Sequence, residues 1–348
     1  MYLDRLRAVT PLLLLVALLA AILGVARTSK HSTDLERIRA SGILKCGSHN
    51  GIPGFFFFKT NGQPAGLSVD FCRALSIAVF GDVNHVRLVP ISMQSRFLAL
   101  QSGEVDVLLP PTAMSIKRDT SLGLTNVATL VNNGVGFLVS RKLNATSARD
   151  LDGRTICVIQ GSTMERAIVD YARPFNITIA TRPYDNLQLE RAAFFSGRCD
   201  GIVDDFVALQ GDVAAAPDPA SYVVLPDNIA KEQDGVMVRS GDASMEKLAR
   251  WTFYAMVQAE EYGIDQKNVD AIYRSRASPE IRRFLGTEGD FGKALGTARN
   301  DWTYQIIRQI GNYGEMFDRS LGKDGLGVDR GKNRLWKDGG MMISEMWQ

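Results

Sequence analysis

The stretch GRCDGIVDDF, residues 197–206, places a short apolar run directly before a pair of carboxylates, Asp204 and Asp205. The run GIV, residues 201–203, has the length and the character of a buried strand. In an open α/β sheet, ligands bind in the crevice beyond the carboxyl ends of the strands. We therefore expect the two carboxylates at a binding crevice, although one or both could instead only cap the helix that follows.

The chain on either side of this stretch alternates short strands with amphipathic helices. Residues 43–109 predict the order strand, helix, strand, helix, strand, and residues 155–203 predict the same order again. Asp70 is the expected N-cap of the first helix and Gly81 its expected end. A strand returns at residues 235–242, and the remainder is mostly helical. This alternation is typical of α/β folds, and the length of 348 residues favours about two domains.

The first 26 residues are typical of a secretory signal peptide. Two basic residues precede an apolar run, residues 11–23, and the small residues Gly24 and Ala26 suit cleavage after Ala26. A retained membrane anchor is the alternative, because the run with its flanks approaches the length that a membrane span needs. No later segment of the sequence approaches that length.

The charge balance argues against a polyanionic partner. The chain has 40 Lys and Arg against 38 Asp and Glu, for a formal charge of +2, and cleavage after Ala26 leaves it close to neutral. Nucleic-acid-binding proteins normally show a strong basic excess or a basic stripe, and neither is visible here. We therefore expect no nucleic-acid partner.

The four cysteines, Cys46, Cys72, Cys157 and Cys199, fall into two widely separated groups. In an exported chain, disulfides are the leading interpretation, and four cysteines allow three pairings. We prefer Cys46–Cys72 with Cys157–Cys199, since each pair then lies inside one predicted domain, and four free buried cysteines are the alternative. With no C-x-x-C motif and only three histidines, we expect no metal site.

Two loops that follow predicted strands offer hydrogen-bond donors for an anion. The donors are Thr112, Ser115, Lys117 and Arg118 in the first loop and Gly161, Ser162 and Thr163 in the second. The second loop opens a predicted helix, whose N-terminal amides attract anions. Together with the carboxylates at the end of the strand at 201–203, these loops suit a molecule with both charges, such as a free amino acid. Each signal is weak alone, because Arg118 could be a solvated surface residue and residues 161–163 an ordinary helix start.

Eight longer motifs carry a family resemblance. They are GILKCG (42–47), VDFCRALSIAVFGD (69–82), RFLALQSGEVDVL (96–108), KRDTSLGL (117–124), DLDGRTICVIQGST (150–163), SGRCD (196–200), EIRRFLGTEGDFGKALG (280–296) and IIRQIGNYGEMFDR (306–319). On these motifs, residues 35–348 resemble the periplasmic amino-acid-binding proteins of ABC transporters, solute-binding protein family 3. The closest likeness is to the general L-amino-acid binding subgroup.

The resemblance implies an α/β fold of two lobes, the type II periplasmic-binding-protein fold. Each lobe would have a central sheet flanked by helices, and two hinge segments would join the lobes. Lobe 1 would comprise residues 33–140 and 235–348, and lobe 2 residues 141–234. The ligand would lie between the lobes, which would close around it.

The resemblance also implies roles for individual residues. Arg118 would clamp the α-carboxylate of the ligand in a bidentate, charge-assisted pair that lysine could not copy. Thr163, with Ser162 and the helix N-terminal amides after Gly161, would reach the same carboxylate from the other lobe. Asp205 would hold the α-ammonium group.

The chain departs from the subgroup just before the arginine, where it reads LPPTAMSIKR, residues 109–118. Close relatives carry a polar, hydroxyl-rich stretch there. Pro111 has no N–H to donate and Ala113 has no hydroxyl. We expect both residues to line the site, and we expect the site to offer the ligand carboxylate one side-chain donor fewer than in close relatives. Met114 is interpreted either as part of an adaptable pocket or as a buried filler. His49 is a candidate neighbour of the ligand side chain.

The implied function is a non-enzymatic receptor. It would capture L-amino acids in the periplasm and deliver them to the membrane permease subunits of an ABC transporter, and we expect a monomer without a cofactor. An enzyme is the alternative, because periplasmic dehydratases that act on small carboxylates use the same fold, and it would need a general acid or base facing the substrate. A ligand-sensing domain fused to signalling machinery is a third hypothesis, although no signalling domain follows in this chain.

Overall fold

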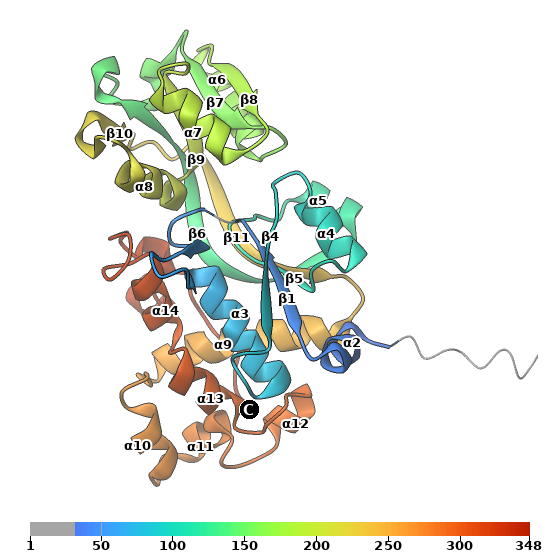
Figure 1. The fold of residues 1–348 in the computed structure, drawn as a ribbon. Coiled ribbons are helices and arrows are strands. Elements are labelled where there is room, and N and C mark those ends of the chain that lie inside the picture. Colours follow the sequence, from blue (N-terminus) through green and yellow to red (C-terminus); the bar gives the residue numbers. More distant parts are fainter. Residues whose placement is uncertain (1–31, 50) are drawn as a thin grey trace, which may run out of the picture.

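The computed structural model describes residues 32–49 and 51–348. The expected signal peptide, residues 1–26, lies outside the described residues. Figure 1 shows two lobes, one above the other. The upper lobe, in green and yellow, is built from the middle of the chain, and the lower lobe from both ends of it, in blue and in orange to red.

The described elements follow the predicted alternation of strands and helices. The strands are β1 (Leu44–Ser48), β2 (Phe57–Phe58), β3 (Pro64–Ala65), β4 (Val86–Pro90), β5 (Val107–Leu108), β6 (Leu124–Ser140), β7 (Thr155–Ile159), β8 (Ala180–Tyr184), β9 (Gly201–Asp205), β10 (Tyr222–Val224) and β11 (Ala230–Arg239). The main helices are α2 (Asp34–Ser41), α3 (Leu67–Phe80), α4 (Arg96–Ser102), α5 (Ile116–Leu122), α6 (Met164–Phe175), α7 (Leu187–Phe195), α8 (Phe206–Ala215), α9 (Ala243–Glu261), α10 (Val269–Arg274), α11 (Pro279–Leu285), α12 (Phe291–Leu295), α13 (Trp302–Gln309) and α14 (Tyr313–Ser320).

One sheet runs through both lobes. Its strand order is β4-β1-β5-β11-β6-β9-β7-β8, and β10 pairs with β6. β1 is parallel to β4 and β5, and β7 is parallel to β8 and β9, because helices connect these strands. The long strands β6 and β11 pair antiparallel and run together from one lobe to the other (Figure 1).

Each lobe has a core of its own. The lower core is formed mainly by α3, α9, α13 and α14 against the sheet. In the upper lobe, Val135, Phe137 and Val139 of β6 pack with Ile156 of β7 and Val203 of β9. The second half of β6 therefore packs with the strands of the upper lobe.

The start of helix α3 corrects one expectation, because Gly66 rather than Asp70 precedes it. Gly66 has a φ of 117°, and a Cβ there would lie 2.2 Å from the carbonyl oxygen of Phe55, so only glycine fits. The Asp70 carboxylate lies in the first turn, where it accepts hydrogen bonds from Arg319 at 2.9 and 2.7 Å. Asp70 therefore ties α14 to α3. Gly81 follows the helix as its C-cap, as predicted.

Two disulfides join strands to neighbouring segments. Cys46 of β1 is bonded to Cys72 of α3, and Cys157 of β7 is bonded to Cys199 just before β9. This is the pairing preferred from the sequence, with one bridge in each lobe. Disulfides that close loops of this size typically contribute about 2–4 kcal/mol to stability.

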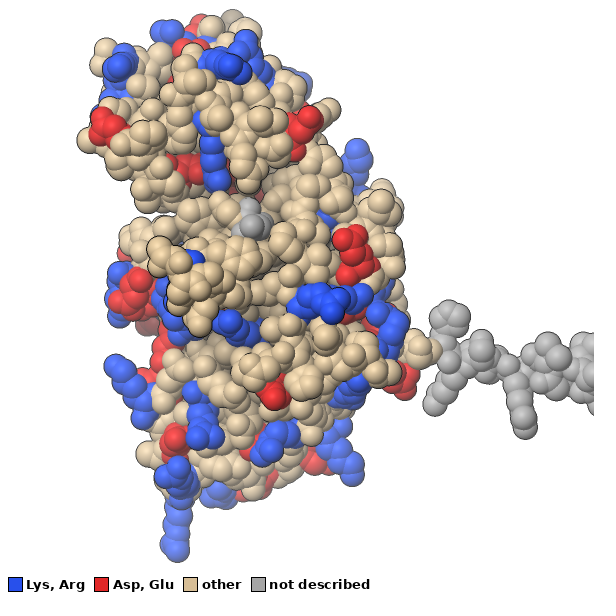
Figure 2. All heavy atoms as spheres, viewed as in Figure 1, with Lys and Arg blue, Asp and Glu red and all other residues tan. Residues whose placement is uncertain are grey.

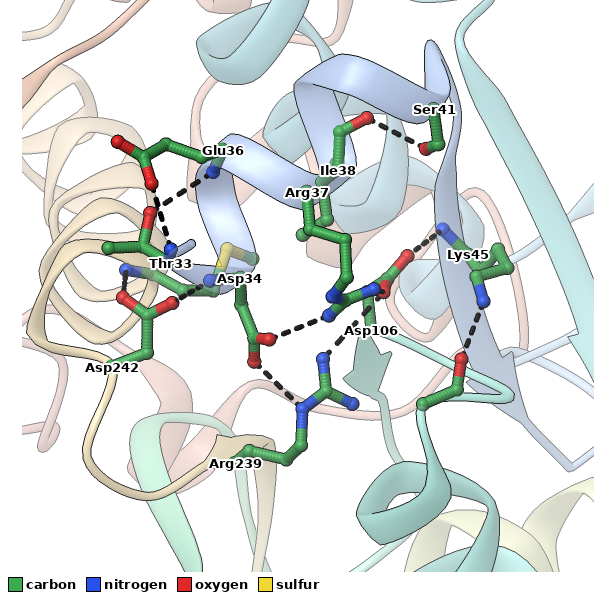
Figure 3. Close-up of polar contacts among 12 residues, drawn as sticks. Thr33, Asp34, Glu36, Arg37, Ile38, Ser41, Lys45, Asp106, Arg239 and Asp242 are labelled. Carbon is green, nitrogen blue, oxygen red and sulfur yellow. Dashed lines mark hydrogen bonds and ion pairs between the residues drawn. The ribbon is translucent and has the colours of Figure 1, made fainter. Parts of the chain in front are cut away.

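A network of charged side chains fixes helix α2 to the rest of the lower lobe (Figure 3). Arg37 of α2 donates to Asp34 at 2.7 Å and to Asp106 at 3.2 Å. Arg239, at the end of β11, donates to Asp34 at 2.8 Å. Asp106 is almost fully buried and also accepts from the backbone N–H of Lys45 at 2.9 Å. The network therefore joins α2, β1 and β11.

A search for membrane spans covered the described part of the chain, residues 32–49 and 51–348. None of its helices has both the length and the apolar character that crossing a membrane requires.

Candidate functional site

A pocket lies between the lobes. Figure 2 shows the molecule notched at the level where the two lobes meet. The pocket is lined by Ile52, Met93, Arg96, Pro111, Thr112, Ala113 and Arg118 from the lower lobe, by Ile159, Ser162, Thr163, Met164, Leu187, Val203, Asp204, Asp205 and Ala208 from the upper lobe, and by Glu232 and Asp234 from β11. It therefore contains charged groups of both signs.

Most of the ligand-binding residues predicted from the sequence meet in this pocket. Those that line it are Arg118, Asp205, Thr163, Ser162, Pro111 and Ala113. Gly161 lies in a hollow that adjoins the pocket next to Arg118. His49 lines a different hollow, next to Met93 and Leu187. These two residues are thus placed at the margins of the pocket rather than in its wall.

Two arginines form the cationic end of the pocket. Arg118 of α5 donates from Nη1 to the carbonyl oxygen of Ala113 at 2.5 Å. Arg96, the first residue of α4, is only 3% exposed, and its Nε has no hydrogen-bond partner among the described residues. Both guanidinium groups lie over the ring of Phe97, at 4.3 Å for Arg96 and 4.9 Å for Arg118. Burial, with the charge of Arg118, lowers the pKa of Arg96 to about 9, so an anion placed here would relieve the repulsion.

The start of helix α6 faces these arginines across the pocket. Thr163 donates from its hydroxyl to Oε1 of Glu232 at 3.0 Å, and the hydroxyl of Ser162 is buried without a partner among the described residues. The backbone N–H of Gly161 is occupied by the side chain of Glu165 at 3.1 Å. Burial raises the pKa of Glu232, which lies near both arginines. The carboxylate of Glu232 therefore sits where the donors for an anion converge.

Carboxylates form a second charged group in the pocket. Asp205 ends β9 and caps α8, accepting from the backbone N–H of Ala208 at 2.8 Å. Asn133 donates to Asp205 at 2.8 Å and to Asp234 at 3.5 Å, which holds these two carboxylates together. Burial raises the pKa of Asp205 to about 6 and raises the pKa of Asp204 and Asp234 well above the usual range. A cation would offset the cost of keeping these groups ionised.

The alternatives at the acidic pair are thus resolved by geometry. The capping carboxylate is Asp205, whereas Asp204 accepts the backbone N–H of Asp205 at 2.9 Å. Asp205 caps helix α8 and also lines the pocket, as Asp204 does.

Three charged residues of the pocket escaped the sequence analysis. Arg96 was seen only as part of a helix, although an arginine at the first position of that helix, after a predicted strand, resembles the placement of Arg118. Glu232 and Asp234 lie on β11, before the apolar run at 236–238. The rule that selected Asp204 and Asp205 looks beyond the carboxyl end of a strand, so it does not reach these two residues.

Comparison with known families shows which family the chain belongs to. The sequence profile of the bacterial extracellular solute-binding proteins, family 3, matches residues 44–276, which is more than half of the chain. This chain belongs to that family. The interlobe pocket is therefore the pocket of a solute-binding protein.

Two relatives of this solute-binding protein match almost end to end. The "General L-amino acid-binding periplasmic protein AapJ" of Rhizobium johnstonii is 40% identical over 335 residues, 95% of this chain and 98% of the relative. The "Glutamate/glutamine/aspartate/asparagine-binding protein BztA" of Rhodobacter capsulatus is 40% identical over 330 residues, 94% of this chain and 96% of the relative.

A solved structure has the same fold as this solute-binding protein. It is described as an ABC transporter periplasmic binding protein from Brucella ovis with glutathione bound. The TM-score is 0.88 at 40% identity, over 91% of this chain and all of that chain. The two-lobed type II fold predicted from the sequence is thereby confirmed.

Proposed function

We propose that this chain is the periplasmic binding component of an amino-acid ABC transporter. In this role it captures L-amino acids between its lobes. One observation carries the proposal: Arg118 and Asp205, from different lobes, line a single pocket. The pocket offers guanidinium groups for an α-carboxylate at one end and carboxylates for an α-ammonium at the other. The relatives AapJ and BztA, both named as amino-acid-binding proteins, support it.

The second arginine favours ligands with an acidic or amide side chain. One α-carboxylate can be held by Arg118 with Thr163 and Ser162. That leaves Arg96, whose buried Nε has no hydrogen-bond partner in the part of the chain that the structure describes. A side-chain carboxylate or a side-chain amide oxygen would accept a hydrogen bond from it. The name of BztA, which gives glutamate, glutamine, aspartate and asparagine, agrees with this ligand class.

Binding is coupled to closure of the lobes in this proposal. The ligand contacts Arg118 below and Thr163 and Asp205 above only when the lobes are close, so it shifts the equilibrium toward the closed form. The division predicted from the sequence, 33–140 with 235–348 against 141–234, is kept in the proposal, with the second half of β6 crossing into the upper lobe, where it pairs with β9. The strands β6 and β11, which run between the lobes, are the proposed hinge segments.

The partners of the proposed receptor are a free amino acid and the permease subunits of the transporter. We place it in the periplasm as a monomer, without cofactor or nucleic acid. The relatives named as periplasmic support that location. The alternative of a dehydratase-like enzyme has no support among the relatives reported above, which are all named as binding proteins. Incubation with amino acids and with prephenate-like acids, followed by analysis for products, tests this alternative directly.

A thermal-shift screen of the purified mature chain tests the function. A ligand that binds only the folded state raises the unfolding midpoint. We expect a dose-dependent rise with L-glutamate, L-glutamine, L-aspartate or L-asparagine, confirmed by calorimetry, and a smaller effect from L-lysine and from the D-isomers. If none of the common L-amino acids shifts the midpoint, the proposed function is wrong.

A further inference from the structure

Two hollows adjoin the proposed amino-acid pocket. One is broad, and Arg118 and Thr163 line both it and the pocket. The second shares Met93 and Leu187 with the pocket. A ligand side chain that extends from the pocket past Met93 and Leu187 would enter this second hollow.

A buried polar group stands in this second hollow. His49 is 8% exposed, and its Nε2 has no hydrogen-bond partner among the described residues. Burial and the charges of Arg96 and Arg191 lower the pKa of His49 to about 4, so the ring is neutral at pH 7. A buried donor or acceptor without a partner is costly. A ligand that ran from the pocket, which Arg96 lines, into the hollow, which His49 lines, could give a partner to both side chains.

The outer wall of the hollow is polar and comes from both lobes. Ser92 of the lower lobe and Asp185 and Gln188 of the upper lobe line it, and all three are exposed. The side-chain amide of Gln94 donates to the backbone carbonyl of Asp185, so the lobes contact each other beside the hollow. A ligand that filled the hollow would therefore be contacted by both lobes, as in the main pocket.

We propose that this hollow, lined by His49, Ser92, Met93, Asp185, Leu187 and Gln188, is an outer subsite for the amide-linked extension of a γ-glutamyl peptide. The inference rests on the proposed function, because the free amino-acid head of the peptide occupies the main pocket. A γ-linkage leaves the α-amino and α-carboxyl groups free for Asp205 and Arg118. It also places an amide at the side-chain end, where Arg96 donates and the neutral His49 offers a ring nitrogen.

A pair of isomers tests the direction of the extension. L-γ-Glutamylglycine and L-α-glutamylglycine contain the same atoms, but the α-isomer has its α-carboxyl group locked in the peptide bond. We expect calorimetry to give a dissociation constant for the γ-isomer within about tenfold of that for L-glutamine, and at least tenfold weaker binding of the α-isomer. Equal binding of the two isomers, or tighter binding of the α-isomer, would overturn the subsite.

A surface variant separates the outer subsite from the main pocket. Gln188→Trp fills the hollow from its exposed rim, and Gln188 does not line the main pocket. We expect the affinity for L-γ-glutamylglycine to fall at least tenfold, while the affinity for L-glutamine changes less than twofold. Leu189→Trp, at the adjacent exposed position outside the hollow, is the matched control and should alter neither. If Gln188→Trp left the affinity for both ligands unchanged, or lowered both affinities equally, the assignment would be contradicted.

A variant of His49 tests the role of the buried imidazole. His49→Leu keeps an apolar side chain in the hollow and removes both ring nitrogens, so the γ-peptide should lose affinity more than L-glutamine does. Failure of this inference differs from failure of the proposed function. If free amino acids bind and the γ-peptide does not, only the outer subsite is wrong. If no free amino acid binds, both are wrong.

Discussion

Thr163, at the start of helix α6, donates from its hydroxyl to Oε1 of Glu232 on the crossing strand β11 at 3.0 Å. The contact brings a carboxylate of the protein to the end of the pocket that carries Arg96 and Arg118. A ligand α-carboxylate at this end would share those donors with Glu232. The charge of Glu232 therefore opposes the binding of a second anion.

Replacing Glu232 by Gln should strengthen the binding of L-glutamate. Glutamine keeps an oxygen that accepts from Thr163 but removes the negative charge, so we expect the dissociation constant to fall about fivefold in calorimetry at pH 7. Glu104→Gln is the control, because Glu104 is exposed and lines neither the pocket nor the hollows next to it. Weaker binding in Glu232→Gln would indicate instead that its charge positions Arg118 or holds the ligand ammonium.

Arg118 is predicted to be the clamp for the α-carboxylate. Arg118→Ala and Arg118→Lys should each weaken amino-acid binding at least tenfold, about 1.4 kcal/mol, because neither variant forms a bidentate pair. Lys267→Ala, at an exposed position that lines neither the pocket nor the hollows next to it, is the control and should bind normally. An unchanged dissociation constant in Arg118→Ala, measured by calorimetry, would rule out the clamp.

The acidic pair should behave unequally. Asp205→Asn removes the charge that would pair with the α-ammonium, so we expect at least tenfold weaker binding. Its stability should change little, because asparagine is also a good N-cap for α8. Asp204→Asn should weaken binding less, since Asp204 mainly accepts the backbone N–H of Asp205 at 2.9 Å. The reverse order of the two dissociation constants would mean that Asp204 is the ammonium partner.

The sequence predicted most of the elements around the site because their signals are local. The strand that ends at Asp205, the loop before Arg118 and the helix start at Thr163 each combine an apolar run with a nearby polar residue. Gly66 shows where that reasoning failed. A Cβ at residue 66 would lie 2.2 Å from the backbone carbonyl oxygen of Phe55, so this position before α3 requires glycine. Because this is a tertiary contact, no local sequence pattern predicts it.

The residues missed in the pocket are those whose position depends on distant segments. Arg96 begins α4 and is almost fully buried, whereas its own sequence context is that of an ordinary amphipathic helix. Glu232 and Asp234 reach the pocket because β11 returns from the upper lobe alongside β6, as the antiparallel pairing of these strands shows. Local periodicity locates strands, but it does not specify which strand passes through the centre of a two-lobed fold.

The buried network around α2 should contribute to stability rather than to binding. Asp106→Asn leaves Arg37 and Arg239 facing a neutral group, and we expect the free energy of unfolding to fall by about 2 kcal/mol in urea denaturation. Asp170→Asn, which breaks an exposed pair with Arg166 on α6, is the control and should leave the midpoint unchanged. Binding of L-glutamine by refolded Asp106→Asn should be normal, and a large loss of affinity would place the network in the ligand site.

The raised pKa of Asp205 predicts how binding depends on pH. Burial raises this pKa from 3.8 to about 6 in the absence of ligand, so the folded protein binds more protons than the unfolded chain between about pH 4 and 6. The contribution of Asp205 to the free energy of unfolding is therefore most favourable in acid and declines as the pH rises through this range. A ligand ammonium next to the carboxylate reverses the effect, because it favours the ionised form.

L-Glutamine binding should consequently weaken in acid, since the carboxyl group must lose its proton before it pairs with the ammonium. We expect the dissociation constant at pH 5 to be about tenfold larger than at pH 7, as a group with a pKa near 6 requires. Glutamine is the appropriate ligand because its side chain does not titrate in this range. Asp205→Asn should bind weakly at both pH values and lose most of the pH dependence. A wild-type dissociation constant that is the same at pH 5 and pH 7 would show that Asp205 is already ionised in the free pocket or does not contact the ammonium.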